Sequence, residues 1–133
     1  MRIRTLLVED EPLSAKYLQR LLGATAEIEL VGIARDGQEA VDAIDRLRPE
    51  LVFLDKLPKL SGFEVLQQVH HKPLVVFLTA HGEYRAMAYE ADAVAFLCKP
   101  VDGDQIRGVI EKILRMKQLL NSTESTDGSR TSS

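Results

Sequence analysis

Leu51-Val52-Phe53-Leu54, followed at once by Asp55, is the stretch of sequence that decides the fold. A short apolar run of this kind is typical of a strand that is buried on both faces of a sheet. The run ends in an acidic residue, at the point where the strand would meet the edge of the sheet. Other apolar runs of similar length occupy residues 5–8, 30–33, 74–78 and 94–97.

Segments with apolar residues at helical spacing alternate with these runs, in stripes within residues 13–22, 40–47, 63–69, 84–91 and 106–114. Pro12 suits the first turn of a helix, Asp36 suits a helix cap, and Ser61 with Glu64 has the spacing of a capping box. Strict alternation of strand and helix predicts a doubly wound α/β fold, with a parallel five-stranded sheet and five helices on its two faces.

Composition predicts a single cytoplasmic domain. The 133 residues are 45% hydrophobic, and no apolar run is long enough to cross a bilayer. The net charge of −3 argues against direct contact with nucleic acid, and the one cysteine, Cys98, forms no internal disulfide. Residues 121–133 include 8 Ser or Thr and no apolar side chain. We expect a folded domain over residues 1–120 and a disordered tail or linker over 121–133.

Reactive side chains follow four of the five expected strands. Glu9 and Asp10 follow the first, Asp55 the third, Thr79 the fourth and Lys99 the fifth. In an open parallel sheet, ligands bind at the carboxyl ends of the strands. Crowded carboxylates repel unless a cation lies among them, and oxygen ligands suit Mg²⁺. A carboxylate nucleophile beside a lysine and a hydroxyl could accept a phosphoryl group. The pattern therefore indicates a metal-assisted phosphoryl-acceptor site.

Each of these features also has a purely structural interpretation. Asp10-Glu11-Pro12 makes a good helix start, with a cap, an acidic first turn and a proline; Asp55 could form a turn, and Lys99-Pro100 is an ordinary turn sequence. Their convergence on one edge of one sheet favours the functional interpretation. His70-His71 is expected at a solvated helix end, because no further metal ligand lies at a suitable spacing.

Four segments carry a resemblance to a known family. Residues 7–12 (LVEDEP), 52–55 (VFLD), 78–80 (LTA) and 96–100 (FLCKP) resemble the signature segments of receiver domains in two-component response regulators, over about residues 2–120. The resemblance implies a flavodoxin-like sheet with strand order 2-1-3-4-5. Residues 79–84 and 93–97 also look like the receivers that are joined to LytTR-type DNA-binding domains.

The resemblance implies a role for each position of the site. Asp55 would be the phosphoacceptor, and Glu9 and Asp10 would bind Mg²⁺, with Asp10 the closer ligand. Thr79 and Phe96 would be the pair of residues that move when the domain switches. Lys99 would bridge the phosphate and the acidic pocket, and the peptide bond between Lys99 and Pro100 would be cis. The donor would be a phosphohistidine of a sensor histidine kinase, and the domain would slowly hydrolyse its own phosphate without turning over small molecules. A surface formed by residues 84–91, 94–97 and 106–114 would contact a partner, an output domain or a second copy.

One loop departs from the family pattern. Pro58 lies three residues after Asp55, where the family usually has four, so the loop is one residue short. The backbone carbonyl of Leu57, the implied third protein ligand of the metal, has an altered position, and Lys56 could compete with the metal or lie in solvent. A phosphorylation-independent docking module is therefore an alternative. A phosphatase with an aspartate nucleophile is disfavoured, because it usually carries a second aspartate where this chain has Leu57.

Overall fold

A five-stranded parallel sheet forms the centre of the protein. It is seen in a computed structural model that describes residues 2–55, 62–79 and 93–129, apart from the side chains of residues 62, 63, 79 and 121–129. The strands are β1 (Ile3–Val8), β2 (Ile28–Ala34), β3 (Leu51–Asp55), β4 (Leu74–Thr79) and β5 (Ala95–Cys98), in the order β2-β1-β3-β4-β5. Every neighbouring pair is parallel. The predicted fold class and strand order are confirmed.

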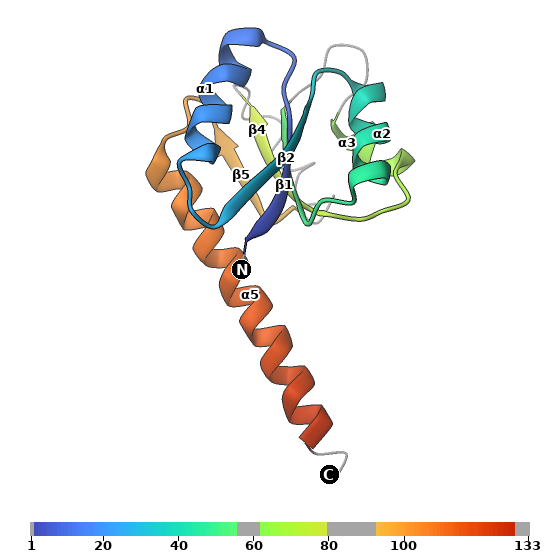
Figure 1. The fold of residues 1–133 in the computed structure, drawn as a ribbon, viewed down its shortest axis with the longest axis vertical. Coiled ribbons are helices and arrows are strands. Elements are labelled where there is room, and N and C mark those ends of the chain that lie inside the picture. The colour runs from blue at the N-terminus through green and yellow to red at the C-terminus, as the bar shows by residue number, and fades with distance from the viewer. Residues whose placement is uncertain (1, 56–61, 80–92, 130–133) are drawn as a thin grey trace.

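Helices cover both faces of the sheet (Figure 1). The helices are α1 (Pro12–Gly23), α2 (Gly37–Leu47), α3 (Gly62–Gln68) and α5 (Gly103–Ser129). In Figure 1, α1 and α5 lie on one side of the sheet, and α2 and α3 lie on the other. The helix expected over residues 84–91 lies outside the described residues, so four of the five predicted helices are observed in the part of the chain that is described.

The strands are apolar on both faces because each face packs against helices. Leu7 and Phe53 belong to a core cluster with residues of α1 and α5, including Leu18 and Ile110. The alternate positions Val8, Val52 and Leu54 belong to a second cluster with residues of α2 and α3, including Ile44 and Val65. All five residues of β3 are buried, and the apolar run predicts this for the first four of them.

Two helix starts follow the signals in the sequence. Pro12 is the first residue of α1, and the carboxylate of Glu11 caps the helix by accepting hydrogen bonds from the backbone N–H groups of Leu13 (3.2 Å) and Ser14 (2.6 Å). The carboxylate of Asp36 caps α2 by accepting from the N–H of Glu39 at 2.8 Å. The predicted cap at Ser61 lies outside the described residues.

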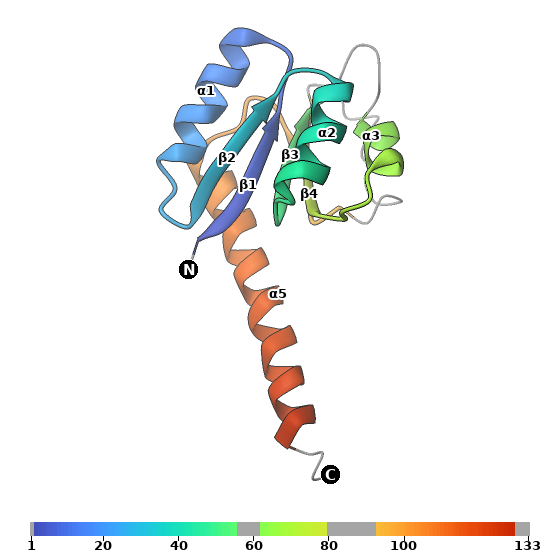
Figure 2. The same ribbon diagram turned by 45° about the vertical axis from the view of Figure 1, so that its right-hand side comes forward.

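Helix α5 continues past the expected domain boundary at residue 120 and ends at Ser129. The segment 121–129 contains no proline, and each residue added to an existing helix adds one backbone hydrogen bond. Figures 1 and 2 show this end of α5 extending away from the sheet, where it covers no strand. The expectation that residues 121–133 are disordered in solution stays a prediction. Within the described residues, no helix combines the length and hydropathy that a bilayer span requires.

Candidate phosphoacceptor site

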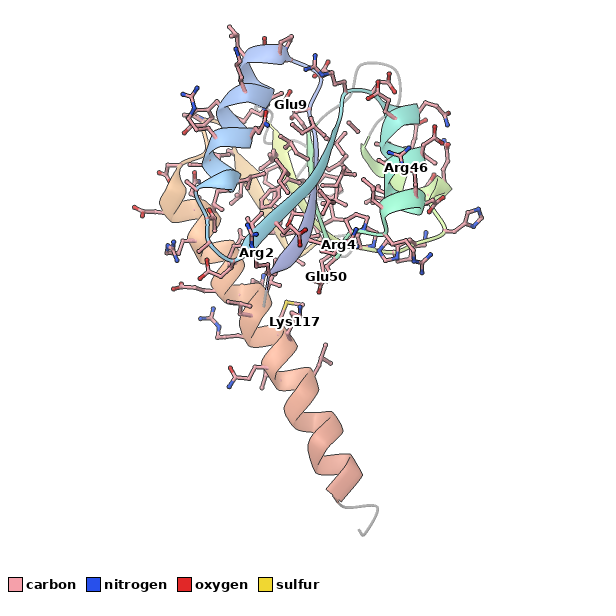
Figure 3. The ribbon with its side chains drawn as sticks, viewed as in Figure 1. Arg2, Arg4, Glu9, Arg46, Glu50 and Lys117 are labelled. Carbon is pink, nitrogen blue, oxygen red and sulfur yellow. The ribbon has the colours of Figure 1, made fainter. Side chains whose placement is uncertain are left out.

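The topology brings the acidic residues together at one edge of the sheet. Glu9 and Asp10 directly follow β1, and Asp55 is the last residue of β3. These two strands are neighbours, and the strand order reverses between them, which is where ligands bind in doubly wound sheets. Figure 3 shows Glu9 near one end of the sheet and Arg2 and Glu50 near the other.

Glu9, Asp10 and Asp55 form an acidic cluster in which one carboxylate oxygen of each residue lies within 4.8 Å of those of the other two. Glu9 is 1% exposed and Asp55 is 8% exposed, whereas Asp10 is exposed. Two buried carboxylates so close together lose solvation and repel each other, which is unfavourable without a nearby cation.

Lys99, which directly follows β5, supplies one such cation. Its Nζ donates to Oε1 of Glu9 at 2.6 Å and to Oδ2 of Asp55 at 2.8 Å, and its side chain is 23% exposed. The peptide between Lys99 and Pro100 is cis, as the resemblance implies. One lysine thus bridges the end of β1 and the end of β3.

A hydroxyl group completes this network, and sequence analysis did not identify it. The Ser14 hydroxyl donates to Oε1 of Glu9 at 2.8 Å and accepts from Nζ of Lys99 at 3.1 Å. The second oxygen of Glu9, Oε2, accepts from the backbone N–H of Glu11 at 3.2 Å. The one signal in the sequence is the place of Ser14 in the first turn of a helix that starts beside the acidic pair.

The environment separates the pKa values of the two buried carboxyls. Burial raises the pKa of Asp55 to about 6; the hydrogen bond and charge of Glu9 act in the same direction, and Lys99 opposes them. Burial also raises the pKa of Glu9, but hydrogen bonds with Asp55, Lys99 and Ser14 outweigh it, so this pKa is below its usual value. The pKa of Lys99 is raised: burial lowers it, but hydrogen bonds to Asp55 and Glu9 prevail. Of these two buried carboxyls, Asp55 is therefore the one that takes up a proton first as the pH falls.

The donor set fits a small divalent cation. Three carboxylates of the acidic cluster face one ammonium group among the described residues, so the cluster keeps an excess of negative charge. Mg²⁺ prefers oxygen ligands and keeps several bound waters, and the exposed Asp10 leaves room for water at this cluster. The further ligand expected from the sequence, the backbone carbonyl of Leu57, lies outside the described residues, as do Lys56 and Pro58.

Comparison with known proteins identifies the family. The sequence matches the response regulator receiver domain over residues 5–111. The chain belongs to this family. It is 37% identical to the transcriptional regulatory protein BtsR of Salmonella typhi over 114 residues, which are 84% of this chain and 48% of that protein. It is 35% identical to the sensory transduction protein LytT of Bacillus cereus over 120 residues, 87% of this chain and 49% of that one.

A solved structure supports the same assignment. The response regulatory domain of mrkE from Klebsiella pneumoniae superposes on this receiver domain with a TM-score of 0.77 and 29% sequence identity, covering 88% of this chain and 99% of that domain. The match to LytT agrees with the subgroup resemblance in the sequence. The chain spans about half the length of the curated relatives that it matches.

The expected switch residues lie on the two strands beyond Asp55. Thr79 is the last residue of β4 and pairs with Cys98 of β5, but its side chain is outside the described part of this receiver domain. Phe96 of β5 is half-buried, pairs with Phe77, and packs against the core cluster on the side of α2 and α3. Their proposed movements stay predictions.

A groove of about 450 Å³ adjoins the acidic cluster of the receiver domain. It runs between the first turns of α1 and the loop after β5, and it shares Ser14 and Lys99 with the acidic site. Tyr17, on its wall, donates a hydrogen bond to the carbonyl of Val101 at 2.6 Å. Helix α1 is thus hydrogen-bonded to the loop that carries Lys99 at two points, through Ser14 and through Tyr17.

Proposed function

We propose that this receiver domain accepts a phosphoryl group on Asp55 from a phosphohistidine of a sensor histidine kinase. The observation that carries the proposal is the environment of Asp55. Its carboxylate is 8% exposed, lies 2.8 Å from the ammonium of Lys99, and belongs to an acidic cluster at the edge of the sheet where ligands bind.

The transfer would use groups that are already close together. A carboxylate oxygen of Asp55 attacks phosphorus, an O–P bond forms, and the N–P bond of the donor breaks. The electron pair of that bond returns to the imidazole nitrogen, which completes the balance of the step. Asp55 must be ionised to act as a nucleophile. The Lys99 ammonium lies 2.8 Å from that carboxylate and stabilises its charge, and it would stabilise the charge on the transferred group as well.

Glu9, Asp10 and Asp55 would hold Mg²⁺, with Asp10 the closer ligand of the acidic pair and with the carbonyl of Leu57 as the further ligand that the resemblance implies. When bound, Mg²⁺ would neutralise carboxylate charge and accept a phosphoryl oxygen. The support for this assignment is the excess of negative charge around Lys99 and the oxygen-only donor set.

Phosphorylation would act as a switch. The Thr79 hydroxyl would move to bond the phosphoryl group, Phe96 would change rotamer with it, and a pre-existing balance between two surfaces would shift. The responding surface would include β5 and α5, with the expected helix at 84–91, and would contact a partner, an output domain or a second copy. We place the domain in the cytoplasm, without direct contact to nucleic acid and with no turnover of small molecules beyond hydrolysis of its own phosphate.

The test is incubation with acetyl phosphate and Mg²⁺ followed by intact-mass measurement. The expected result is a gain of one phosphoryl group that is absent in Asp55→Asn and is abolished by EDTA. A folded protein that gains no phosphoryl group at any Mg²⁺ concentration would contradict the proposal. That outcome would favour the docking module, in which the short loop between Asp55 and Pro58 prevents metal binding.

A further inference from the structure

The Ser14 hydroxyl both donates and accepts a hydrogen bond within the acceptor site, and its own helix does not need it. The start of α1 is capped by the carboxylate of Glu11, which accepts from the backbone N–H of Ser14 at 2.6 Å. The side chain of Ser14 is therefore not needed as a cap. Its hydroxyl has one proton to donate and lone pairs to accept with, and it donates to Glu9 at 2.8 Å while it accepts from Lys99 at 3.1 Å.

These contacts make the ammonium of Lys99 a saturated donor. An ammonium group has three protons, and those of Lys99 have three acceptors: Glu9 at 2.6 Å, Asp55 at 2.8 Å and Ser14 at 3.1 Å. Oε1 of Glu9 in turn accepts from both Lys99 and Ser14, so the three side chains close a triangle of hydrogen bonds. Removing the hydroxyl would leave one ammonium proton without its acceptor in a half-buried site, and would remove one of the hydrogen bonds that orient each of the two charged groups.

We propose that Ser14 is a positioning residue for phosphoryl acceptance, which holds the Lys99 ammonium and the Glu9 carboxylate in the geometry that faces Asp55. Ser14 has no hydrogen bond to Asp55 and acts through its two neighbours. The inference rests on the proposed function, because Lys99 and Glu9 gain their importance from the acceptor role of Asp55. It does not rest on helix stability, since alanine is a better helix former than serine.

The test compares Ser14→Ala with Ser14→Thr, which restores the hydroxyl, and with Gln19→Ala, an exposed change on the same helix. The rate of phosphorylation by acetyl phosphate is followed by intact mass, and folding is checked by thermal unfolding. We expect Ser14→Ala to remain folded and to react about tenfold more slowly, as for the loss of one hydrogen bond to a charged group. Ser14→Thr should keep most of the rate, and Gln19→Ala should match the original protein.

A second readout is independent of phosphorylation. The ¹H–¹⁵N signal of the Lys99 ammonium, observed by NMR without metal or donor, reports how firmly its three protons are held. We expect this signal in the original protein and in Ser14→Thr, and its broadening by exchange with water in Ser14→Ala. An unchanged signal in Ser14→Ala, or an unchanged phosphorylation rate in a protein that does react, would overturn the inference. If the original protein gains no phosphoryl group, the proposed function fails, and the ammonium signal alone decides the role of Ser14.

Discussion

Nζ of Lys99 lies 2.8 Å from Oδ2 of Asp55, although the strands that carry them are not neighbours in the sheet. β4 lies between β3 and β5, and adjacent strands are about 4.8 Å apart, so the ammonium must span roughly two strand spacings. A long, unbranched side chain at the end of β5 can do this. Lys99 consequently links the end of β5 to the acidic residues at the ends of β1 and β3.

Removing the Lys99 ammonium should destabilise the metal-free protein. In Lys99→Ala, the carboxylates of Glu9 and Asp55 would face each other without the ammonium that pairs with both of them, which we expect to cost about 1–3 kcal/mol of unfolding free energy at pH 8. Added Mg²⁺ should recover much of this loss, because a second cation would replace the first. Urea unfolding with Mg²⁺ or with EDTA measures both effects.

The control for this experiment is Lys16→Ala, which removes an exposed lysine from α1. It should change the unfolding free energy little in either condition. Equal stability of Lys99→Ala and the original protein in EDTA would show that the ion pairs of Lys99 contribute nothing net.

Asp55 should make the metal-free protein less stable as the pH rises. The folded-state pKa is raised from 3.8 to about 6, mainly by burial, so the folded protein binds more protons than the unfolded chain between these values. Unfolding free energy therefore falls as the pH rises through this window, by at most about 3 kcal/mol. Asp55→Asn removes the titration, so its stability relative to the original protein should increase from pH 4 to pH 7 in EDTA.

Urea unfolding at a series of pH values checks this prediction, with Glu111→Gln, an exposed change on α5, as the control. Glu9 acts in the opposite direction at lower pH: its pKa lies below 4.5, so its stabilising contribution is lost as the pH falls through that lower range. A constant difference in stability between Asp55→Asn and the original protein would contradict the raised pKa of Asp55.

Asp10 should affect metal binding more than stability. It is the exposed member of the acidic cluster, so Asp10→Asn removes the charge of a proposed ligand without disturbing a buried ion pair. We expect roughly tenfold weaker Mn²⁺ binding by calorimetry and an unchanged unfolding temperature in EDTA. Asp42→Asn, an exposed change on α2, is the matched control and should bind Mn²⁺ as the original protein does. Full Mn²⁺ affinity in Asp10→Asn would exclude Asp10 as a ligand.

The sequence allowed the sheet and its reactive edge to be predicted because both depend on local patterns. An apolar run such as 51–54 is buried wherever it lies in a doubly wound sheet, and the residue that follows it must lie at the carboxyl edge. Asp55 and Lys99 could therefore be assigned to one site before any distance was known. The same reasoning accounts for the helix start at Pro12 and the cap at Asp36, which depend on neighbours within a few residues.

Contacts between segments that are distant in the sequence could not be predicted, because no local sequence pattern indicates them. The bond from Tyr17 to Val101 joins residues that are 84 positions apart, and nothing at either position indicates it. His70 is exposed, as expected for a helix end, but His71 is half-buried with Nε2 2.6 Å from the carbonyl oxygen of Pro49. The backbone N–H groups of His70 and His71 both donate to Oδ1 of Asp45, at 2.8 and 3.0 Å. The bond from His71 contributes most to the lowered pKa of Asp45. These partners depend on how the loops meet in three dimensions.

The segment after Leu120 should contribute nothing to the stability of the domain. The last apolar residues of α5, Leu119 and Leu120, are 68% and 62% exposed, and Figure 2 shows the helix beyond them extending away from the sheet. An unsupported helical turn rich in Ser and Thr has a low intrinsic helix propensity. We therefore expect truncation after Leu120 to change the unfolding free energy by less than about 0.5 kcal/mol, and backbone amides of residues 121–129 to exchange with water at rates typical of unfolded chains. Amide exchange followed by NMR measures this directly, and slow exchange over these residues would show that the helix is stable beyond the sheet.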